Sequence, residues 1–264
     1  LSNLYAKYVN KLSVYENEVQ RLIEEEKIQA KNLMYQMTEE ERNSFWAFHD
    51  QTKDFVFCLD VSPATLYDYA LFYKGILLSC TRQIGKIVGK ANDAELNALY
   101  SEYIIVKQNT ADVEKSNDKL RLLERQLLSR CKDLGYAINE DMTYTDLLKI
   151  LDKDTYAVEF IDYKKHKTAT DSLEYTKYIA LIINKDWDTP RLVELCLEDD
   201  LSEAVVLQDK AYSDNTLYEL IWKPLEKYIP KGAKVYYSPA GITNKVAFEA
   251  IKVSKKAILS DNYD

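Results

Sequence analysis

The sequence is poor in the two residues that most often interrupt regular structure. Its 264 residues include only 6 glycines and 5 prolines, whereas 47% are hydrophobic and 21 are tyrosine. Few turn-forming residues and ample apolar surface predict long regular elements, mainly helices, around a sizeable core. The chain is therefore expected to be folded and rich in helix.

Positive charge and long apolar runs are also scarce. The 35 Lys and Arg residues are outnumbered by 43 Asp and Glu residues, which gives a net charge of −8. Because non-specific nucleic-acid binding depends on clustered cations, we expect no direct nucleic-acid partner. The best apolar run, residues 69–80, is interrupted by Lys74 and Gly75 and falls short of the roughly 20 residues that cross a bilayer. We expect no membrane partner.

Cysteine is too sparse for a metal site or a disulfide framework. The four cysteines stand far apart, at Cys58, Cys80, Cys131 and Cys196, with no CxxC spacing. Such spacing excludes the common zinc patterns and dense disulfide scaffolds. Together with the lack of a signal-peptide pattern, it predicts a cytoplasmic location, no metal and no cofactor.

The first half of the chain has the period of helices. Apolar residues recur every three or four positions from residue 1 to about 134, beginning with a stripe at Leu4, Tyr8, Leu12 and Tyr15. Ser62 and Pro63 predict the start of a long helix that ends near residues 85–89. Asn92 or Asp93 is expected to cap the next helix, and a charged helix should span 113–134. Such helix hairpins are typical of tetratricopeptide-type (TPR) repeats, although no clean 34-residue period aligns.

The spacing of apolar residues changes after Gly135. Thr143 and Asp146 form a capping-box pattern for a short helix to Leu151. Three apolar runs, at 156–163, 175–184 and 191–197, predict strands in a meander. Helices are expected at 201–207 and 213–229, the second kinked or shortened by Pro224, and a further strand at 234–237.

A turn follows that last strand. Ser238, Pro239, Ala240 and Gly241 have the residue order of a type I turn. The turn should return Val246 and Phe248 toward the sheet. The predicted fold class is multi-domain, α followed by α/β: a helical-hairpin, TPR-like region at 1–140 and a sheet-and-helix domain at 141–264.

Several segments, in order, resemble CHAT domains, the caspase-like cysteine peptidase domains that occur with tetratricopeptide repeats. The most specific is "VYYSPAGITNKVAFEAI" at 235–251, which is similar to the family's strand, S-P-D-G turn and "FEA" segment. Upstream, "DTYAVEFIDY", "YIALIIN" and "TLYELIWKPLEKYIPKGAKVYYSP" resemble its N-terminal half in Bacteroidetes-type members. "TLYDYALFYKGILLSCTRQI" and "ELNALYSEYIIVKQ" resemble the helical region before it. The departures are Ala240 in place of Asp and Val246-Ala247 in place of Leu-Pro.

The resemblance implies the N-terminal portion of a caspase-like sheet-and-helix domain. The family's catalytic His and Cys lie downstream of the "FEA" segment and map to no position up to Asp264, so we expect the catalytic half outside this chain. We assign no catalytic, cofactor-binding or metal-binding residue. The sheet should then continue beyond Ile258 and Leu259, and its open edge predicts either a homodimer or marginal solubility.

No substitute catalytic pair is expected within the chain. His49 falls in a helical aromatic stripe and His166 in the lysine-rich segment "DYKKHK". Cys58 and Cys80 occupy helical positions that look buried, and Cys196 follows Leu195 in a strand. Isolated cysteines and histidines in such settings are usually structural.

Other charged and glycine-containing motifs also favour structural roles. Gly85 to Lys90, "GKIVGK", lacks the spacing and the Ser or Thr of a phosphate loop. The acidic runs 24–26, 39–41 and 198–200 are expected to be solvated faces or helix starts. Glu159 and Glu249 each interrupt an apolar strand pattern; each either faces solvent or serves as a hydrogen-bond acceptor or ion-pair partner.

Two functions remain open from the sequence. In the first, the chain is the regulatory and scaffold portion of a TPR-CHAT peptidase, whose helical region receives a protein partner and whose sheet supports the protease half. In the second, it is a non-catalytic interaction module with a degenerate CHAT fold. In that case the partner is expected on the aromatic helical face around Phe45, Trp46 and Tyr69.

Overall fold

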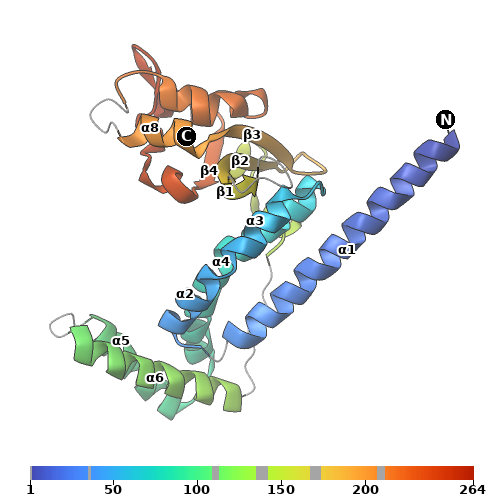
Figure 1. Ribbon diagram of the computed structural model, residues 1–264. Helices are drawn as coiled ribbons and strands as arrows, with labels where there is room; N and C mark the ends of the chain where they lie inside the picture. Colours follow the sequence, from blue (N-terminus) through green and yellow to red (C-terminus); the bar gives the residue numbers. More distant parts are fainter. Residues whose placement is uncertain (1, 35–36, 109–112, 135–141, 167–173, 207–211) are drawn as a thin grey trace. The chain divides into compact units, whose positions relative to one another are not determined.

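The computed structural model describes residues 2–34, 37–108, 113–134, 142–166, 174–206 and 212–264. The chain forms two compact units, one from residues 1–51 and 72–141 and the other from residues 52–71 and 142–264. Helices dominate the first unit, and a four-stranded sheet lies at the centre of the second (Figure 1). The mixed α and α/β composition agrees with the sequence-based fold class at this coarse level. The predicted domain boundary between residues 140 and 141 stays a prediction. The two compact units also divide near residue 141, but the second unit includes the segment 52–71 as well.

The first unit contains the helices that the apolar period predicts. They are α1 (Ser2–Met34), α2 (Glu39–Ala47), α5 (Ala94–Gln108), α6 (Val113–Asp133) and residues 72–90 of α4 (Pro63–Lys90). Asn92 or Asp93 was expected to cap α5. The structure has Asp93 as the cap, because it accepts a 2.8 Å hydrogen bond from the Leu96 N–H. No described helix is long and apolar enough to cross a membrane.

Helices α5 and α6 form an antiparallel hairpin. Arg130 near the end of α6 meets Asp93 at the start of α5 at 2.7 Å, and Lys119 meets Glu102 at 2.8 Å further along. Their shared core is apolar and includes Leu96, Leu123 and Leu127. The expected helix hairpin is thus present, while its membership of a TPR array stays a prediction.

The second unit is a sheet covered on both faces. Its strands are β1 (Thr155–His166), β2 (Glu174–Asn184), β3 (Arg191–Leu197) and β4 (Lys234–Ser238), in the order β3-β2-β1-β4. The pairs β1–β2 and β2–β3 are antiparallel, which confirms the predicted meander, and β4 runs parallel to β1. A small second sheet pairs β5 (Lys252–Ser254) with β6 (Ala257–Ile258).

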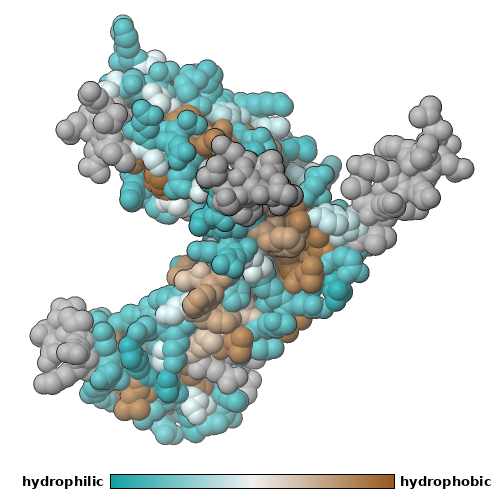
Figure 2. Space-filling view, viewed as in Figure 1, coloured by the Kyte–Doolittle hydropathy of each residue, from teal (hydrophilic) through white to brown (hydrophobic). Residues whose placement is uncertain are grey.

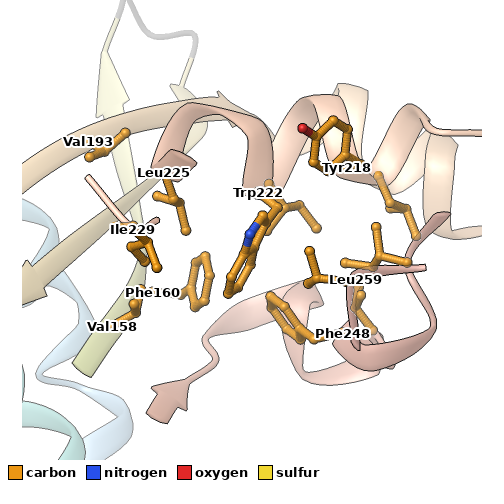
Figure 3. Packing of buried hydrophobic residues seen from close by; sticks show 14 of the residues in the cluster. Val158, Phe160, Val193, Tyr218, Trp222, Leu225, Ile229, Phe248 and Leu259 are labelled. Carbon is orange, nitrogen blue, oxygen red and sulfur yellow. The ribbon is translucent and has the colours of Figure 1, made fainter. Parts of the chain in front are cut away.

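One face of the sheet carries a large core with helical turns of three kinds. These are α8 (Glu198–Val206), the π-helix η1 (Tyr218–Trp222) and the 3-10 helices η2 (Lys223–Lys227), η3 (Gly241–Lys245), η4 (Phe248–Ala250) and η5 (Leu259–Asp261). The irregular helix at η1 and η2 confirms the effect predicted for Pro224, because proline removes an intrahelical hydrogen bond and crowds the preceding turn. Figure 3 shows Trp222, Phe160 and Phe248 among the buried side chains of this core.

The opposite face is covered by the segment 52–71 and α7 (Tyr144–Ile150). The ring of Phe57, in α3 (Asp50–Cys58), lies 6.1 Å from the ring of Tyr163 on β1. Asp68 accepts a 2.6 Å hydrogen bond from the Tyr144 N–H at the start of α7. The predicted capping box of α7 is present as well, with Thr143 and Asp146 bonded to each other's backbone N–H.

The turn after β4 differs from the prediction. Ala240 is extended, with φ −143° and ψ 155°, which is incompatible with the third position of a type I turn. Gly241 has φ +50°, and the Ile242 N–H donates a 2.8 Å hydrogen bond to the Tyr178 hydroxyl. The chain then returns as the 3-10 turns η3 and η4 and not as a strand. Val246 and Phe248 do return to the core, as predicted.

Gly241 offers a direct test of this corner. A Cβ at this position would lie 2.3 Å from the Tyr178 hydroxyl oxygen, whereas a Cβ at Gly232, whose φ is +85°, would meet no atom within 4 Å. We expect Gly232→Ala to lower the free energy of unfolding by about 1 kcal/mol, from the positive φ alone. Gly241→Ala should cost roughly 1–3 kcal/mol more because of the clash. Urea denaturation of both variants measures the difference, and equal losses would contradict the close approach.

Candidate functional site

The first unit contains a cleft of about 420 Å³. It lies where the start of α2 meets the α5–α6 hairpin. Its lining combines carboxylates, cations, amides and hydroxyls: Thr38, Glu39, Glu40, Asn43, Ser44, Tyr103, Lys107, Asn117, Leu120, Arg121 and Glu124. None of these residues is a cysteine or a histidine.

The cleft is shaped by the way α2 begins. Thr38 is its N-cap: the Thr38 N–H donates to a Glu41 carboxylate oxygen at 2.8 Å, and the Glu41 N–H donates to Thr38 Oγ1 at 3.4 Å. This reciprocal capping satisfies backbone N–H groups that have no partner within the helix. The acidic run 39–41 therefore begins a helix, as the sequence predicts for such runs.

Four consecutive residues of α2 then form ion pairs with the hairpin. Glu39 meets Lys107 at 2.6 Å, and Glu41 meets Arg125 at 2.8 Å. The other two pairs are Glu40 with Arg121 at 2.5 Å and Arg42 with Glu124 at 2.6 Å. The pairs at 39–41 are partly exposed and so contribute little individually to stability.

The Arg42–Glu124 pair is different because it is buried. The two residues are 2% and 4% exposed. The second Glu124 carboxylate oxygen accepts a 2.8 Å hydrogen bond from the Glu39 N–H, and Arg42 also donates to the Met37 carbonyl at 2.7 Å. A carboxylate from α6 thus caps α2 while its charge is balanced by Arg42.

Tyr103 and Lys107 shape the electrostatics of the cleft wall. Lys107 Nζ donates to the Tyr103 hydroxyl at 3.2 Å, and that hydroxyl lies 3.4 Å from Glu39. Burial raises the pKa of Tyr103. The hydrogen bond from Lys107 lowers the pKa of Glu39. Burial opposes the charge on Lys107, but its bonds to Glu39 and Tyr103 carry its pKa above the ordinary value.

The histidines and cysteines considered from the sequence do not form a catalytic pair in the described part of the chain. His49 lies in the turn after α2, stacked on Trp46 at 4.6 Å, with Nδ1 3.2 Å from the Phe45 carbonyl oxygen. The side chain of His166 lies outside the described residues.

The cysteines have structural surroundings. Cys80 is buried as predicted and Cys196 is half-buried in β3, but Cys58 is exposed, contrary to its predicted burial. The reason is that α3 places Cys58 at the margin of the sheet, where its thiol donates to the Lys164 carbonyl at 3.4 Å. Burial raises the pKa of Cys196 to about 12 and also raises that of Cys80. Thiols held protonated are poor nucleophiles.

The remaining candidate motifs are structural. Gly85 and Gly89 lie within helix α4, so "GKIVGK" forms no phosphate loop, and Tyr100 packs close to Gly85. Glu249 is exposed in η4, which corrects its predicted strand position and fits the solvent-facing alternative. Glu159 is half-buried in β1. Among the described residues, no three metal-ligating side chains gather into a metal site.

The aromatic helical face expected to bind a partner is largely core. Trp46 is 5% exposed and Tyr69 is fully buried. Trp46 donates from Nε1 to the Tyr73 carbonyl at 3.1 Å, while Tyr69 packs on Phe57 at 5.9 Å. The rings of Trp46 and Tyr69 are thus core side chains, whereas Phe45 is half-buried; the expected partner stays a prediction.

Sequence reasoning missed the cleft, although a signal for it was present. The run Glu39–Arg42 has its charge complement in Lys107 of α5 and in Arg121, Glu124 and Arg125 of α6. Positions 121, 124 and 125 share one helical face by their spacing of three and four. Charge complementarity between the two elements, read together, would have indicated their contact.

Comparison with protein-family models gives no match to this chain. Comparison with curated proteins gives none either. The chemistry of the described residues therefore carries the functional argument.

The buried pair predicts unequal costs for two identical substitutions. Arg42→Met leaves Glu124 buried without its cation and should lower the free energy of unfolding by roughly 3–5 kcal/mol. Arg125→Met removes only the exposed pair with Glu41 and should cost less than about 1 kcal/mol. Chemical denaturation followed by circular dichroism compares them, and similar losses would refute the special role of Arg42.

The Glu39–Lys107 pair predicts a pH window. The pKa of Glu39 lies below its ordinary value of 4.5, so its stabilisation is present above about pH 4.5 and lost as the pH falls through the lowered value. The pKa of Lys107 lies above 10.5, so its part is present below about pH 10.5 and lost at higher pH. The stability difference between the natural chain and Glu39→Gln should be constant between these limits and shrink outside them. A difference that does not decrease at all as the pH falls below 4.5 would contradict this.

Proposed function

We propose that this chain is the regulatory and scaffold portion of a CHAT-type, caspase-like cysteine peptidase. In this role the helical unit receives a protein signal and the sheet unit supports a protease half that supplies the catalytic His and Cys. The proposed location is the cytoplasm.

The observation that carries the proposal is the position of Phe248 in the "FEA" segment. Its ring lies 5.1 Å from Phe160 of β1 and 6.4 Å from Trp222 of η1 (Figure 3). It also lies 4.4 Å from Tyr237 of β4. Phe160 and Trp222 come from two other segments through which the chain resembles a CHAT domain. Segments separated by up to 88 positions in the sequence therefore meet in one core, which supports their origin in a single domain type.

The structure of the corner also suits a scaffold role. Gly241 and Ile242 are held against Tyr178 of β2, and Thr243 Oγ1 bonds to the backbone of Ala240 on both its N–H and its C=O. The backbone after β4 is thus held by three partly buried hydrogen bonds. A corner held in this way at the end of a parallel strand is a suitable support for the proposed protease half.

The alternative function is a non-catalytic interaction module. What favours it is exposed apolar surface on the helical unit: Phe48 is 82% exposed, Ile105 65% and Leu78 52%. On the face drawn in Figure 2, hydrophobic side chains gather in separate areas among hydrophilic ones. A contiguous apolar patch on a protein surface marks a contact site, whereas single exposed apolar residues are ordinary.

The reading frame that encodes the chain separates the two functions. Under the peptidase proposal, the frame continues past the Asp264 codon and encodes a His before a Gly and then a Cys. The full-length protein should cleave peptides, and Cys→Ala at that downstream cysteine should abolish the cleavage. Residues 1–264 alone should show no cleavage in the same assay.

Two outcomes would overturn the peptidase proposal. One is a frame that lacks the downstream pair, which leaves the interaction module as the remaining function. The other is cleavage by residues 1–264 alone that a thiol alkylator stops, because the nucleophile would then be one of the four cysteines described above.

A further inference from the structure

Helix α4 runs without interruption from the second unit into the first. Its residues 63–71 belong to the second unit and its residues 72–90 to the first. A second connection crosses within α3, whose first two residues belong to the first unit, and a turn at Phe48 and His49 separates α3 from α2. Because a continuous helix is a stiffer spacer than a turn, α4 is the stiffer of these two connections.

A glycine lies in α4 close to this crossing. Gly75 is the fourth residue of the part of α4 that belongs to the first unit. A Cβ at this position would meet no atom within 4 Å, whereas a Cβ at Gly85 of the same helix would lie 3.0 Å from the Tyr100 hydroxyl oxygen. Packing therefore does not require a glycine at position 75. A glycine there weakens the helix, because its backbone has more conformational freedom than that of any other residue.

The turn of α4 that contains Gly75 also shares a carbonyl group with a side chain. Trp46 Nε1 donates a 3.1 Å hydrogen bond to the Tyr73 carbonyl oxygen. In an α-helix this carbonyl accepts from the N–H of residue 77, so Trp46 competes for the hydrogen bond that spans Gly75. Helices bend where a side chain inserts into this ladder of hydrogen bonds. Gly75 and Trp46 thus weaken the same turn of α4, residues 73–77.

Trp46 also holds the turn after α2 beside this weak point. Its ring stacks on the ring of His49 at 4.6 Å and lies 5.2 Å from the ring of Tyr73. The Tyr73 hydroxyl donates to the Asp50 carboxylate at the start of α3. One point of flexure in each of the two connections therefore lies next to the other. Two adjacent points of this kind define an axis about which both connections can bend together.

We propose that residues 73–77 of α4 and the turn at 48–49 form a hinge through which the two units change their relative orientation. The inference goes beyond the proposed function and holds for either alternative, because it concerns the connections and not the chemistry of a protease half. A partner that binds the helical unit more tightly in one orientation shifts the population toward that orientation. A signal received by the helical unit reaches the sheet unit in this way.

Distances between the two units test the hinge. Asp118 of α6 and Glu203 of α8, both exposed, are changed to Cys and spin-labelled in a chain with Cys58→Ser and Cys196→Ala. Double electron–electron resonance then gives the distribution of distances between the labels. The chain with Gly75 should give a broad distribution, and Gly75→Ala should narrow its width by at least about a third, because alanine stiffens the weak turn.

Gly89→Ala is the matched control. A Cβ at Gly89 also meets no atom within 4 Å, but Gly89 lies one residue before the end of α4 at Lys90, away from the crossing. Its substitution should leave the distance distribution unchanged. Hydrogen exchange of a peptide that covers residues 73–79 provides a local readout, which Gly75→Ala should slow at least about threefold and Gly89→Ala should not change.

Three results would overturn the hinge. The first is a distribution in the chain with Gly75 that is already as narrow as in Gly75→Ala. The second is equal narrowing by Gly89→Ala, because the effect would then come from helix propensity in general. The third is unchanged hydrogen exchange of residues 73–79 in Gly75→Ala. Circular dichroism of each variant checks that the helix content is retained.

Discussion

The second unit depends on the need to pair every backbone group of its longest strand. Strand β1 pairs with β2 along almost its whole length, but its parallel partner β4 reaches only from residue 155 to 159. The rest of that edge requires other partners, because unpaired backbone groups are costly away from water. Helix α3 supplies them at Lys164: Asp54 accepts from its N–H at 3.0 Å, and the Cys58 thiol donates to its carbonyl. Helix α3 thus supplies both backbone partners at one residue of the edge that β4 leaves open.

Further contacts with the sheet explain why the segment 52–71 belongs to the second unit. Lys53 adds an ion pair to Asp162 at 3.4 Å, and Phe57 packs on Tyr163. The segment 52–71 has the period of a helical region, and by that period alone it belongs with the helices before and after it. Its side chains instead pack on the sheet, so that the compact unit is discontinuous in sequence.

The first unit is held by a comparable constraint on a short helix. At nine residues, α2 is too short to be stable without tertiary support. Glu124 and Arg42 provide that support at its first turn, and Trp46 does so at its end. The exposed ion pairs of residues 39–41 orient α2 on the α5–α6 hairpin but contribute little to its stability.

The sequence by itself determined the regular elements of this protein. Period and capping residues predicted α4 from Ser62 and Pro63, α7 from Thr143 and the meander β1 to β3, because these features depend on neighbours within a few positions. Only the tertiary structure decided the cleft, the exposure of Cys58, the burial of Trp46 and Tyr69 and the form of the turn at Ala240. Each of these depends on a residue distant in sequence: Glu124 for α2, Lys164 for Cys58, Tyr178 for Gly241. Local propensity contains no information on which distant group will satisfy a donor or fill a space, and that choice is made when the elements pack together.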